Sequence, residues 1–246
     1  MQHLFNNANV ALCTCRQSAT DDWTLVHVTD RIVDDCFVSN KTKERGYVFP
    51  LWLYEENMGK VEKHANMNPE IVAKIGTAIG GEASPEDIFA YIYGVLHTPQ
   101  YRTKFKEFLK TDFPRIPYPK DVAQFEAVVD VGHALMETHL LRDAKPTLKE
   151  IRGTFPVAGD DEVLRVVWEP ADAYRGKVWI NGTQYFDNVP KVAWDMPVGG
   201  YRPAEKWLKD RKCGKLGNDE KDHYQRIIIA LDKTASLIAK LEKLSN

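Results

Sequence analysis

The first sixty residues carry short apolar stretches separated by polar breaks, without the period of a long helix. β-branched and aromatic residues gather at 9–15, 23–28 and 32–38, and such clusters favour short strands. Residues 47–54, YVFPLWLY, are apolar almost throughout, so we expect an extended segment buried on both sides, with Pro50 limiting the regularity of its ladder. The pattern predicts a β-rich block over residues 1–60.

Helix signals replace the strand pattern between residues 68 and 110. Three times a residue that favours the N-cap stands directly before a proline: Asn68-Pro69, Ser84-Pro85 and Thr98-Pro99. Because proline at the first helical position loses no hydrogen bond, each pair predicts a helix start. The first helix should end at Gly80-Gly81. The third should be amphipathic, with a basic face formed by Arg102, Lys104, Lys106 and Lys110.

Residues 112–120, DFPRIPYPK, form a connector that can be neither helix nor central strand. Each proline removes a donor and pushes the preceding residue to extended geometry, so we expect an ordered, extended loop. Asp121 follows as the cap of a long helix, with Gln124 three residues later.

Strand patterns return between residues 162 and 197, in the segments VLRVVWE, KVWI, TQYF and KVAWD, with Asn181-Gly182 as a hairpin turn. The chain finishes with a helix over 219–244. These elements predict an α+β fold with two β-rich blocks, a helical middle section and a long C-terminal helix. We treat 1–246 as a single region that divides into 1–60 (β-rich), 61–150 (helical), 151–200 (β-rich) and 201–246 (helical).

The composition is that of a globular protein with a substantial core. The chain has 246 residues, of which 43% are hydrophobic and 28% charged. The apolar runs are too short to cross a bilayer, and the N-terminus lacks the pattern of a signal peptide, so we expect no membrane association and a cytoplasmic location. Four scattered cysteines predict reduced thiols rather than a disulfide framework.

Charge is unevenly distributed along the chain. Residues 1–100 hold 8 basic and 13 acidic side chains, whereas residues 101–246 hold 25 and 22. Two segments concentrate the positive charge, a first basic window at 101–120 and a second at 199–217, each with six Lys or Arg against two acids. A solvated helix face is the ordinary meaning of such a window, so each alone is a weak indication of an anionic partner.

The sequence contains no catalytic signature that we recognise: no phosphate-binding glycine loop, dinucleotide fingerprint, nucleophile elbow, HExxH or paired CxxC. His133 and Glu137 stand four apart with His139 nearby, but further ligands are missing, and we predict no metal site. An enzyme whose site assembles from four dispersed residues stays open as an alternative: His97, His133, Glu137 and His139.

Nucleic acid fits the remaining features best, because phosphate binding needs clustered Lys and Arg. The second basic window, GGYRPAEKWLKDRKCGKLG, surrounds Trp207 with cations. The structural alternative is a short amphipathic helix that turns Trp207 and Leu208 inward and leaves its lysines in solvent.

Several segments in fixed order resemble one family. VWING (178–182), QYFDNVPKVAWD (184–195), GGYRPAEKWLKDRK (199–212) and HYQRIIIAL (223–231) are similar to the C-terminal specificity region of type ISP and related type IIG restriction-modification enzymes. Earlier matches are Arg16-Gln17, FPLWLY (49–54), YIYGVLHTPQYR (91–102) and FLKTDFPRIPYP (108–119). The sequence departs from the pattern at Trp52, where tyrosine is expected, and at Cys213, where glycine is expected.

The resemblance implies a target recognition domain that reads a short sequence of double-stranded DNA. An adenine methyltransferase and a nuclease would lie outside this chain, fused to it or supplied in trans. The chain itself would then hold no cofactor and no catalytic residue. S-adenosylmethionine and Mg would belong to the associated catalytic domains.

Candidate DNA contacts follow from the same reasoning. For the phosphates we predict Arg102, Lys104, Arg115, Lys206, Lys209, Arg211 and Lys212. More speculative candidates near loops are Arg16, Gln17, Lys41, Lys43 and Arg45. Arg115, between prolines, could instead be a buried arginine that pins the connector. A second alternative for the whole chain is a protein-docking module, for which we expect one large exposed apolar patch.

Overall fold

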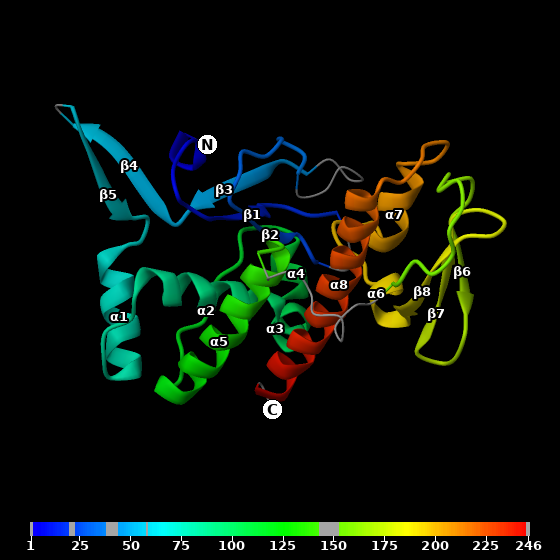
Figure 1. Cartoon of the computed structure of the whole chain (residues 1–246). Coiled ribbons are helices and arrows are strands. Elements are labelled where there is room, and N and C mark those ends of the chain that lie inside the picture. The colour runs from blue at the N-terminus through cyan, green and yellow to red at the C-terminus, as the bar shows by residue number, and fades with distance from the viewer. Residues whose placement is uncertain (1, 20–22, 38–43, 58, 143–152, 245–246) are drawn as a thin grey trace. The chain divides into compact units, whose positions relative to one another are not determined.

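The computed structural model describes the chain except for residues 1, 20–22, 38–43, 58, 143–152 and 245–246 (Figure 1). It divides into two compact units, the first formed by Met1–Leu140 with Leu237–Asn246 and the second by Leu141–Ser236. Helices and antiparallel sheets occur in both units. The predicted α+β class with a long C-terminal helix is therefore confirmed.

A three-stranded antiparallel sheet opens the first unit, after a short 3-10 helix, η1 (Gln2–Leu4). Strand β1 (Ala11–Cys15) lies between β2 (Val26–Thr29) and β3 (Gly46–Pro50). Cys13 and Cys15, two residues apart and so on one face, are buried in the core, and burial raises the pKa of the Cys13 thiol to about 12.

The predicted strand at 32–38 is wrong over its described residues. Residues 32–37 form a turn rather than a strand, in which the Asp34 carboxylate accepts a hydrogen bond from the Cys36 amide at 2.9 Å. An Asp side chain that accepts a hydrogen bond from the amide two residues ahead stabilises a turn in place of the hydrogen bonds of a sheet. The strand preference of the neighbouring apolar residues is too weak to prevent this turn.

The apolar run 47–54 is also not buried on both sides as predicted. It bends at the buried Leu51 and divides into β3 and β4 (Trp52–Asn57), and the side chains of Tyr47 and Phe49 remain 39% and 40% exposed. Strand β4 pairs with β5 (Lys60–Ala65) in a separate two-stranded sheet (Figure 1). Strand structure thus continues five residues beyond the expected end of the first block.

Five helices follow in the first unit, which also includes the last residues of the chain from Leu237: α1 (Pro69–Ile79), α2 (Pro85–His97), α3 (Pro99–Lys104), α4 (Lys106–Leu109) and α5 (Val122–His139). The three predicted starts are confirmed. Asn68 and Ser84 accept hydrogen bonds from the first-turn amides, whereas the Thr98 hydroxyl donates back to the Gly94 carbonyl at 3.1 Å. Gly80 ends α1 with φ of 71°, as a C-terminal glycine does.

The single basic helix expected after Thr98 is wrong, because the chain breaks at Phe105 into α3 and α4. Tyr101 and Leu109 are buried on either side of the break. The connector 112–120 contains neither helix nor strand, as predicted, and Asp121 caps α5 by accepting from the Gln124 amide at 2.8 Å.

The second unit contains a three-stranded antiparallel sheet in the order β6 (Val167–Pro170), β7 (Arg175–Trp179), β8 (Tyr185–Pro190). The hairpin at Asn181-Gly182 is confirmed, but the connection runs from Ile180 to Gln184 rather than through a two-residue turn. The Asn181 side chain organises it by accepting from the amides of Thr183 and Gln184 at 2.9 and 2.7 Å.

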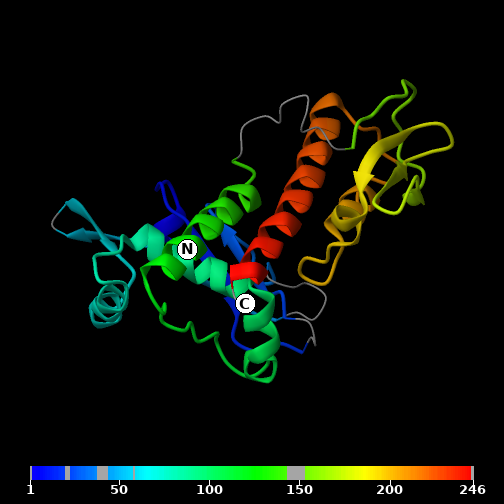
Figure 2. The same cartoon turned by 90° about the horizontal axis from the view of Figure 1, so that it is seen from below.

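Helices α6 (Lys191–Asp195), α7 (Pro203–Lys209) and α8 (Asn218–Leu244) follow the sheet. The prediction of a strand at KVAWD is wrong, because this segment forms α6. Ala193 on this helix is buried, and the ring of Trp194 stacks on that of Trp168 with centroids 5.6 Å apart. Helix α8 is one continuous helix, as Figure 2 shows, and Tyr224 and Ile228 on it are fully buried. No helix in the described residues is long and apolar enough to cross a membrane.

Candidate nucleic-acid interface

Most cations of the second basic window are paired with carboxylates of the same unit. On and beside α7, Arg202 and Lys209 both bind Glu205, and Lys206 binds Asp210. Burial acts to raise the pKa of Glu205, but hydrogen bonds from Lys209 and Arg202 outweigh it, and the pKa lies below its usual value. The charge that the sequence concentrates here is largely neutralised locally.

Arg211 is held by three contacts. Its guanidinium lies 3.5 Å from the centroid of the Trp207 ring, donates to the Trp207 carbonyl at 3.1 Å, and pairs with Glu220 at 2.8 Å. Leu208 is fully buried and Trp207 half-buried, so the amphipathic-helix interpretation of this window is confirmed.

Lys212 and Lys215 differ from the other cations of the window. Both are exposed, and neither forms an ion pair with another residue that the structure describes. Between them Cys213 has φ of 66°, a left-handed conformation that glycine adopts without strain. This position is where the family resemblance leads us to expect glycine.

The first basic window, in the first unit, also separates into different environments. The Arg102 side chain is partly buried: Nε donates to the Leu96 carbonyl at 2.7 Å, and burial lowers its pKa to about 10. Its guanidinium also lies 5.9 Å from the centroid of the Trp23 ring. Its contact with a phosphate stays a prediction. Lys104 is exposed, with Nζ 5.4 Å from the centroid of Phe105.

Arg16 and Arg115 are brought together around Asp112, although they are far apart in sequence. Arg16 Nε lies 3.2 Å from the Asp112 carboxylate. The Phe113 amide and Arg16 hold the pKa of Asp112 below its usual value, and the charge of Arg115 acts in the same direction. Arg115 is exposed, with its guanidinium 4.9 Å from the Phe108 ring centroid. Its side chain is therefore not the buried pin that we considered.

The sequence did not point to the aromatic residues beside these cations. Phe113 packs edge-on against Tyr47 and Phe49, with ring centroids 5.0 and 5.6 Å apart. The alternation of Tyr47 and Phe49 on β3 was the available signal, since residues two apart share a face. We define the connector cluster as Arg16, Tyr47, Phe49, Asp112, Phe113 and Arg115.

The remaining loop candidates are less constrained. Gln17 is exposed next to Arg16, and Arg45 lies 3.6 Å from the Asp35 carboxylate. Lys41 and Lys43 lie outside the described residues.

The four residues of the dispersed enzyme alternative do not converge on one site. His97 is buried and His139 partly buried, with ring centroids 5.3 Å apart, and burial lowers the pKa of both, that of His139 to about 4. His133 instead pairs with Asp87 at 3.1 Å, half-exposed to solvent, and Glu137 is exposed. Within the described residues no group of three His, Cys, Asp or Glu side chains is placed to hold a metal ion.

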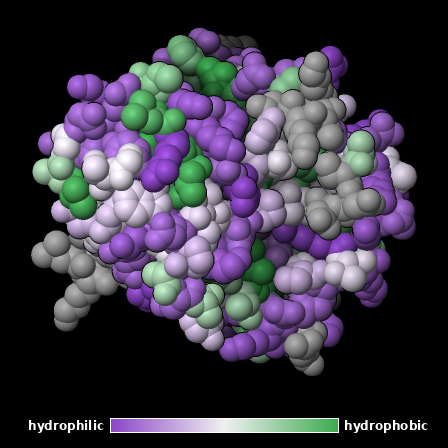
Figure 3. All heavy atoms as spheres, turned by 90° about the vertical axis from the view of Figure 1, so that its right-hand side faces the viewer, coloured by the Kyte–Doolittle hydropathy of each residue, from purple (hydrophilic) through white to green (hydrophobic). Residues whose placement is uncertain are grey.

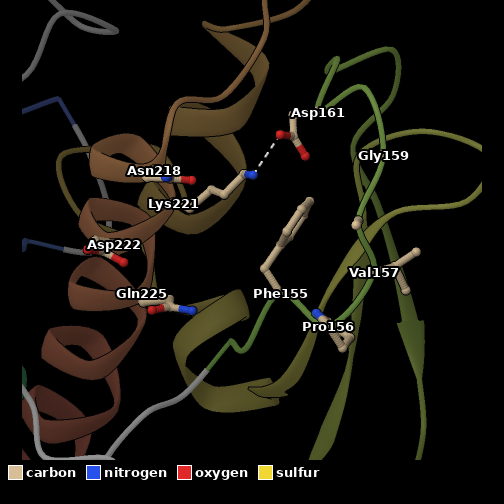
Figure 4. A pocket seen from close by; sticks show the side chains of 10 residues that line it. Phe155, Pro156, Val157, Gly159, Asp161, Asn218, Lys221, Asp222 and Gln225 are labelled. Atoms are coloured by element: carbon tan, nitrogen blue, oxygen red, sulfur yellow. Dashed lines mark ion pairs between the residues drawn. The ribbon is translucent and has the colours of Figure 1, made fainter.

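A polar pocket of about 470 Å³ lies in the second unit, between the 155–161 segment and the first turns of α8 (Figure 4). Lys221 points into it and pairs with Asp161 at 2.7 Å, which lowers the pKa of that carboxyl. The cation also lies 4.7 Å from the Phe155 ring centroid. Lysine and carboxylate thus satisfy each other, and none of the predicted site residues lines this pocket.

The molecular surface bears on the protein-docking alternative. Among the described residues on the face shown in Figure 3, hydrophilic side chains predominate and hydrophobic ones lie in small separate groups. That face does not present the large apolar patch that this alternative requires.

Three solved structures resemble this chain. The ATP-dependent Type ISP restriction-modification enzyme LlaBIII bound to DNA gives a TM-score of 0.73 at 19% identity, over 96% of this chain and 16% of that one. The DrdV–DNA complex gives a TM-score of 0.68 at 22% identity, and the match covers 98% of this chain and 25% of that one. A nuclease-deletion mutant of the Type ISP restriction-modification enzyme LlaGI in complex with a DNA substrate mimic gives a TM-score of 0.63 at 19% identity. That match covers 95% of this chain and 18% of that one.

These likenesses are of fold, and this chain spans a quarter or less of the length of each protein. No curated protein matches the sequence. The family model for the Type ISP C-terminal specificity domain matches residues 1–240, nearly the whole chain. This chain therefore belongs to the Type ISP C-terminal specificity domain family.

Proposed function

We propose that this chain recognises a short sequence in double-stranded DNA, as the specificity domain of a restriction-modification enzyme. It would present that site to an adenine methyltransferase and a nuclease outside this chain, fused or in trans, and those domains would bind S-adenosylmethionine and Mg. The observation that carries the proposal is the family match over residues 1–240. The DNA complexes of three proteins with the same fold support it.

Phosphate contacts are assigned to cations that are exposed and not fully paired within the chain. Lys104 and Arg115 meet this condition in the first unit, and Lys212 meets it in the second. Lys215 also meets it, and we add it to the predicted contacts. Lys206, Lys209 and Arg211 would have to exchange a carboxylate for a phosphate, which reduces the net gain in free energy. Arg102 is partly buried and bonded to the Leu96 carbonyl, so we propose it as a phosphate contact with less exposed surface than Lys104.

Base reading needs side chains that can form paired hydrogen bonds in the major groove. Arg16 and Gln17, in the segment that follows β1, carry suitable groups, since Arg pairs with guanine and Gln with adenine. Lys41, Lys43 and Arg45 precede β3 and are proposed for the same role. The connector cluster would fix the position of Arg16 through Asp112.

The test is fluorescence anisotropy with a randomised duplex pool across a salt series, followed by sequencing of the retained DNA. We expect enrichment of a short motif, and an observed binding constant whose logarithm falls linearly with the logarithm of salt concentration. Retention without a motif would reject sequence recognition by this chain. No binding at low salt would reject DNA contact and favour the protein-docking alternative.

A further inference from the structure

The outward face of the β6–β7–β8 sheet is aromatic and cationic. On β7, Gly176 and Val178 are buried, whereas Arg175, Lys177 and Trp179 alternate with them on the solvent side. Tyr185 on β8 pairs with Trp179 in the sheet, and their ring centroids are 4.6 Å apart. Two large rings, those of Trp179 and Tyr185, are thus half-buried on the face that carries Arg175 and Lys177.

Two cations lie over these aromatic rings. Lys177 Nζ is 4.4 Å from the centroid of Tyr185, and the Arg165 guanidinium is 5.7 Å from that of Trp179. The Trp179 indole N–H donates to Glu169 at 2.8 Å, and Arg165 Nε donates to the Asn181 carbonyl at 3.0 Å. These contacts restrict the side chains without neutralising the two cations.

The third cation, Arg175, lies beside a β-bulge. The register of β7 and β8 shifts between Gly176 and Val178, and Asn188 in the extra stretch has φ of 56°. The Asn188 side-chain oxygen accepts from Arg175 at 2.7 Å. A bulge of this kind directs side chains away from the regular pleat and is frequent next to functional sites.

The contrast with α7 decides what this face can bind. Four cations of the second basic window are paired with carboxylates, whereas Arg165, Arg175 and Lys177 contact rings or amide and carbonyl oxygens. Within the described residues these three cations form no ion pair within 4.0 Å, although Glu169 stands opposite Lys177 in the sheet and the charge of Arg175 helps to lower the pKa of Asp172. Their contacts already reduce their side-chain entropy. A polyanion can therefore bind them without first breaking a direct ion pair, and the Glu169 carboxylate is held by the Trp179 indole N–H.

We propose that this sheet face, defined as Arg165, Arg175, Lys177, Trp179 and Tyr185, binds the sugar–phosphate backbone of double-stranded DNA. The inference rests on the proposed function and adds to it the surface by which the second unit holds the duplex. The three cations bind phosphates, and the two rings keep Lys177 and Arg165 in position.

The test uses the full chain and a labelled duplex of random sequence, with anisotropy measured across a salt series. The triple variant Arg165→Ala, Arg175→Ala, Lys177→Ala removes the three charges. Because each phosphate contact contributes about 0.9 to the slope of log K against log salt, we expect the slope to fall by up to about three times that amount. The matched control is Lys191→Ala, a cation of the same unit that pairs with Asp195, for which we expect the wild-type slope.

A charge-retaining variant separates binding from folding. Arg165→Lys with Arg175→Lys removes the guanidinium contacts to Asn181 and Asn188 but keeps both charges, so the salt slope should remain close to that of the wild type. Trp179 supplies a second readout: added duplex should change the tryptophan fluorescence of the wild type, and Trp179→Phe should reduce that change.

The outcomes distinguish this inference from the proposed function. If the wild type binds and enriches a motif while the triple variant keeps the wild-type slope, the sheet face is not a DNA contact and the proposed function stands. If the wild type does not bind DNA at low salt, both are overturned.

Discussion

His139 shows how one partly buried side chain couples stability to pH in the first unit. Its Nδ1 lies 2.6 Å from the Tyr93 hydroxyl oxygen, and the His97 Nδ1–H donates to the Tyr93 carbonyl at 2.8 Å. Burial, and then the charges of His27 and Arg102, lower the pKa of His139 to about 4. The folded state therefore favours the neutral form of this imidazole.

The sign of the effect follows from linkage. The pKa of His139 is 6.5 when unperturbed and lower when folded, so its contribution to stability is complete above pH 6.5 and is lost as the pH falls towards 4. The shift corresponds to about 3 kcal/mol at most. We expect urea unfolding to show a loss of stability between pH 7 and pH 5 that is smaller in His139→Gln, which cannot gain a proton.

His133→Gln is the comparison, because His133 is half-exposed and paired with Asp87. It should keep the acid sensitivity of the wild type between pH 7 and pH 5. If His139→Gln shows the same pH dependence as the wild type, the neutral imidazole is not its source, and His97 alone becomes the candidate.

At the scale of elements, helices α2 and α5 pack closely because glycine lies at their contact. A Cβ atom added to Gly132 on α5 would lie 2.0 Å from the Ala90 carbonyl oxygen on α2, which neither backbone can accommodate without moving. Gly132→Ala should therefore destabilise the protein by about 1 to 3 kcal/mol, the usual range for overpacking. The free energy of unfolding from chemical denaturation measures this effect.

Gly81→Ala provides the matched substitution. Nothing lies within 4 Å of the position that its Cβ would occupy, so its free energy of unfolding should remain within about 0.5 kcal/mol of the wild type. Because Gly→Ala lowers the entropy of the unfolded chain and so favours the folded state, that effect cannot produce a loss. A Gly132→Ala variant no less stable than Gly81→Ala would show that the contact of α2 with α5 accommodates the added methyl group.

The elements that the sequence predicted well are those with local determinants. Asn68, Ser84 and Asp121 bond to amides two or three residues ahead, so the information lies within one turn. The errors lie where distant contacts decide. KVAWD has a strand-like composition but folds as α6, where Trp194 stacks on Trp168, 26 positions earlier. In the apolar 47–54 segment only Leu51 is buried, and the chain divides there between β3 and β4.

At the scale of the whole molecule, the sequence located the charge but not its availability. The basic windows are visible in the linear sequence, yet Arg211 is paired with Glu220 and Arg16 with Asp112, which is 96 positions away. Arg102 is partly buried and donates to the Leu96 carbonyl, so less of its guanidinium is exposed than the sequence suggests. The α7 pairs are three or four positions apart and are visible in the sequence, but the pairing of Arg16 with Asp112 has no local signature. A count of Lys and Arg alone therefore overestimates the positive surface.

The availability of charge leads to a prediction about DNA binding by the intact chain. The formal net charge is −2, so attraction to DNA must come from local surpluses of positive charge, within the Debye length of about 8 Å at physiological salt. Lys212 and Lys215 form such a surplus, whereas Lys206 is paired with Asp210. We expect Lys212→Ala and Lys215→Ala each to lower the salt slope of duplex binding by about 0.9.

Lys206→Ala should lower the slope by much less, because the lysine that it removes is already neutralised and exchanges one partner for another on binding. Anisotropy with the same random duplex measures all three variants, and circular dichroism verifies that each is folded. Equal losses for Lys206 and Lys212 would show that the α7 ion pairs open when DNA binds. The internal carboxylates would then compete with DNA for these cations, and binding by this window would be weaker than its charge alone indicates.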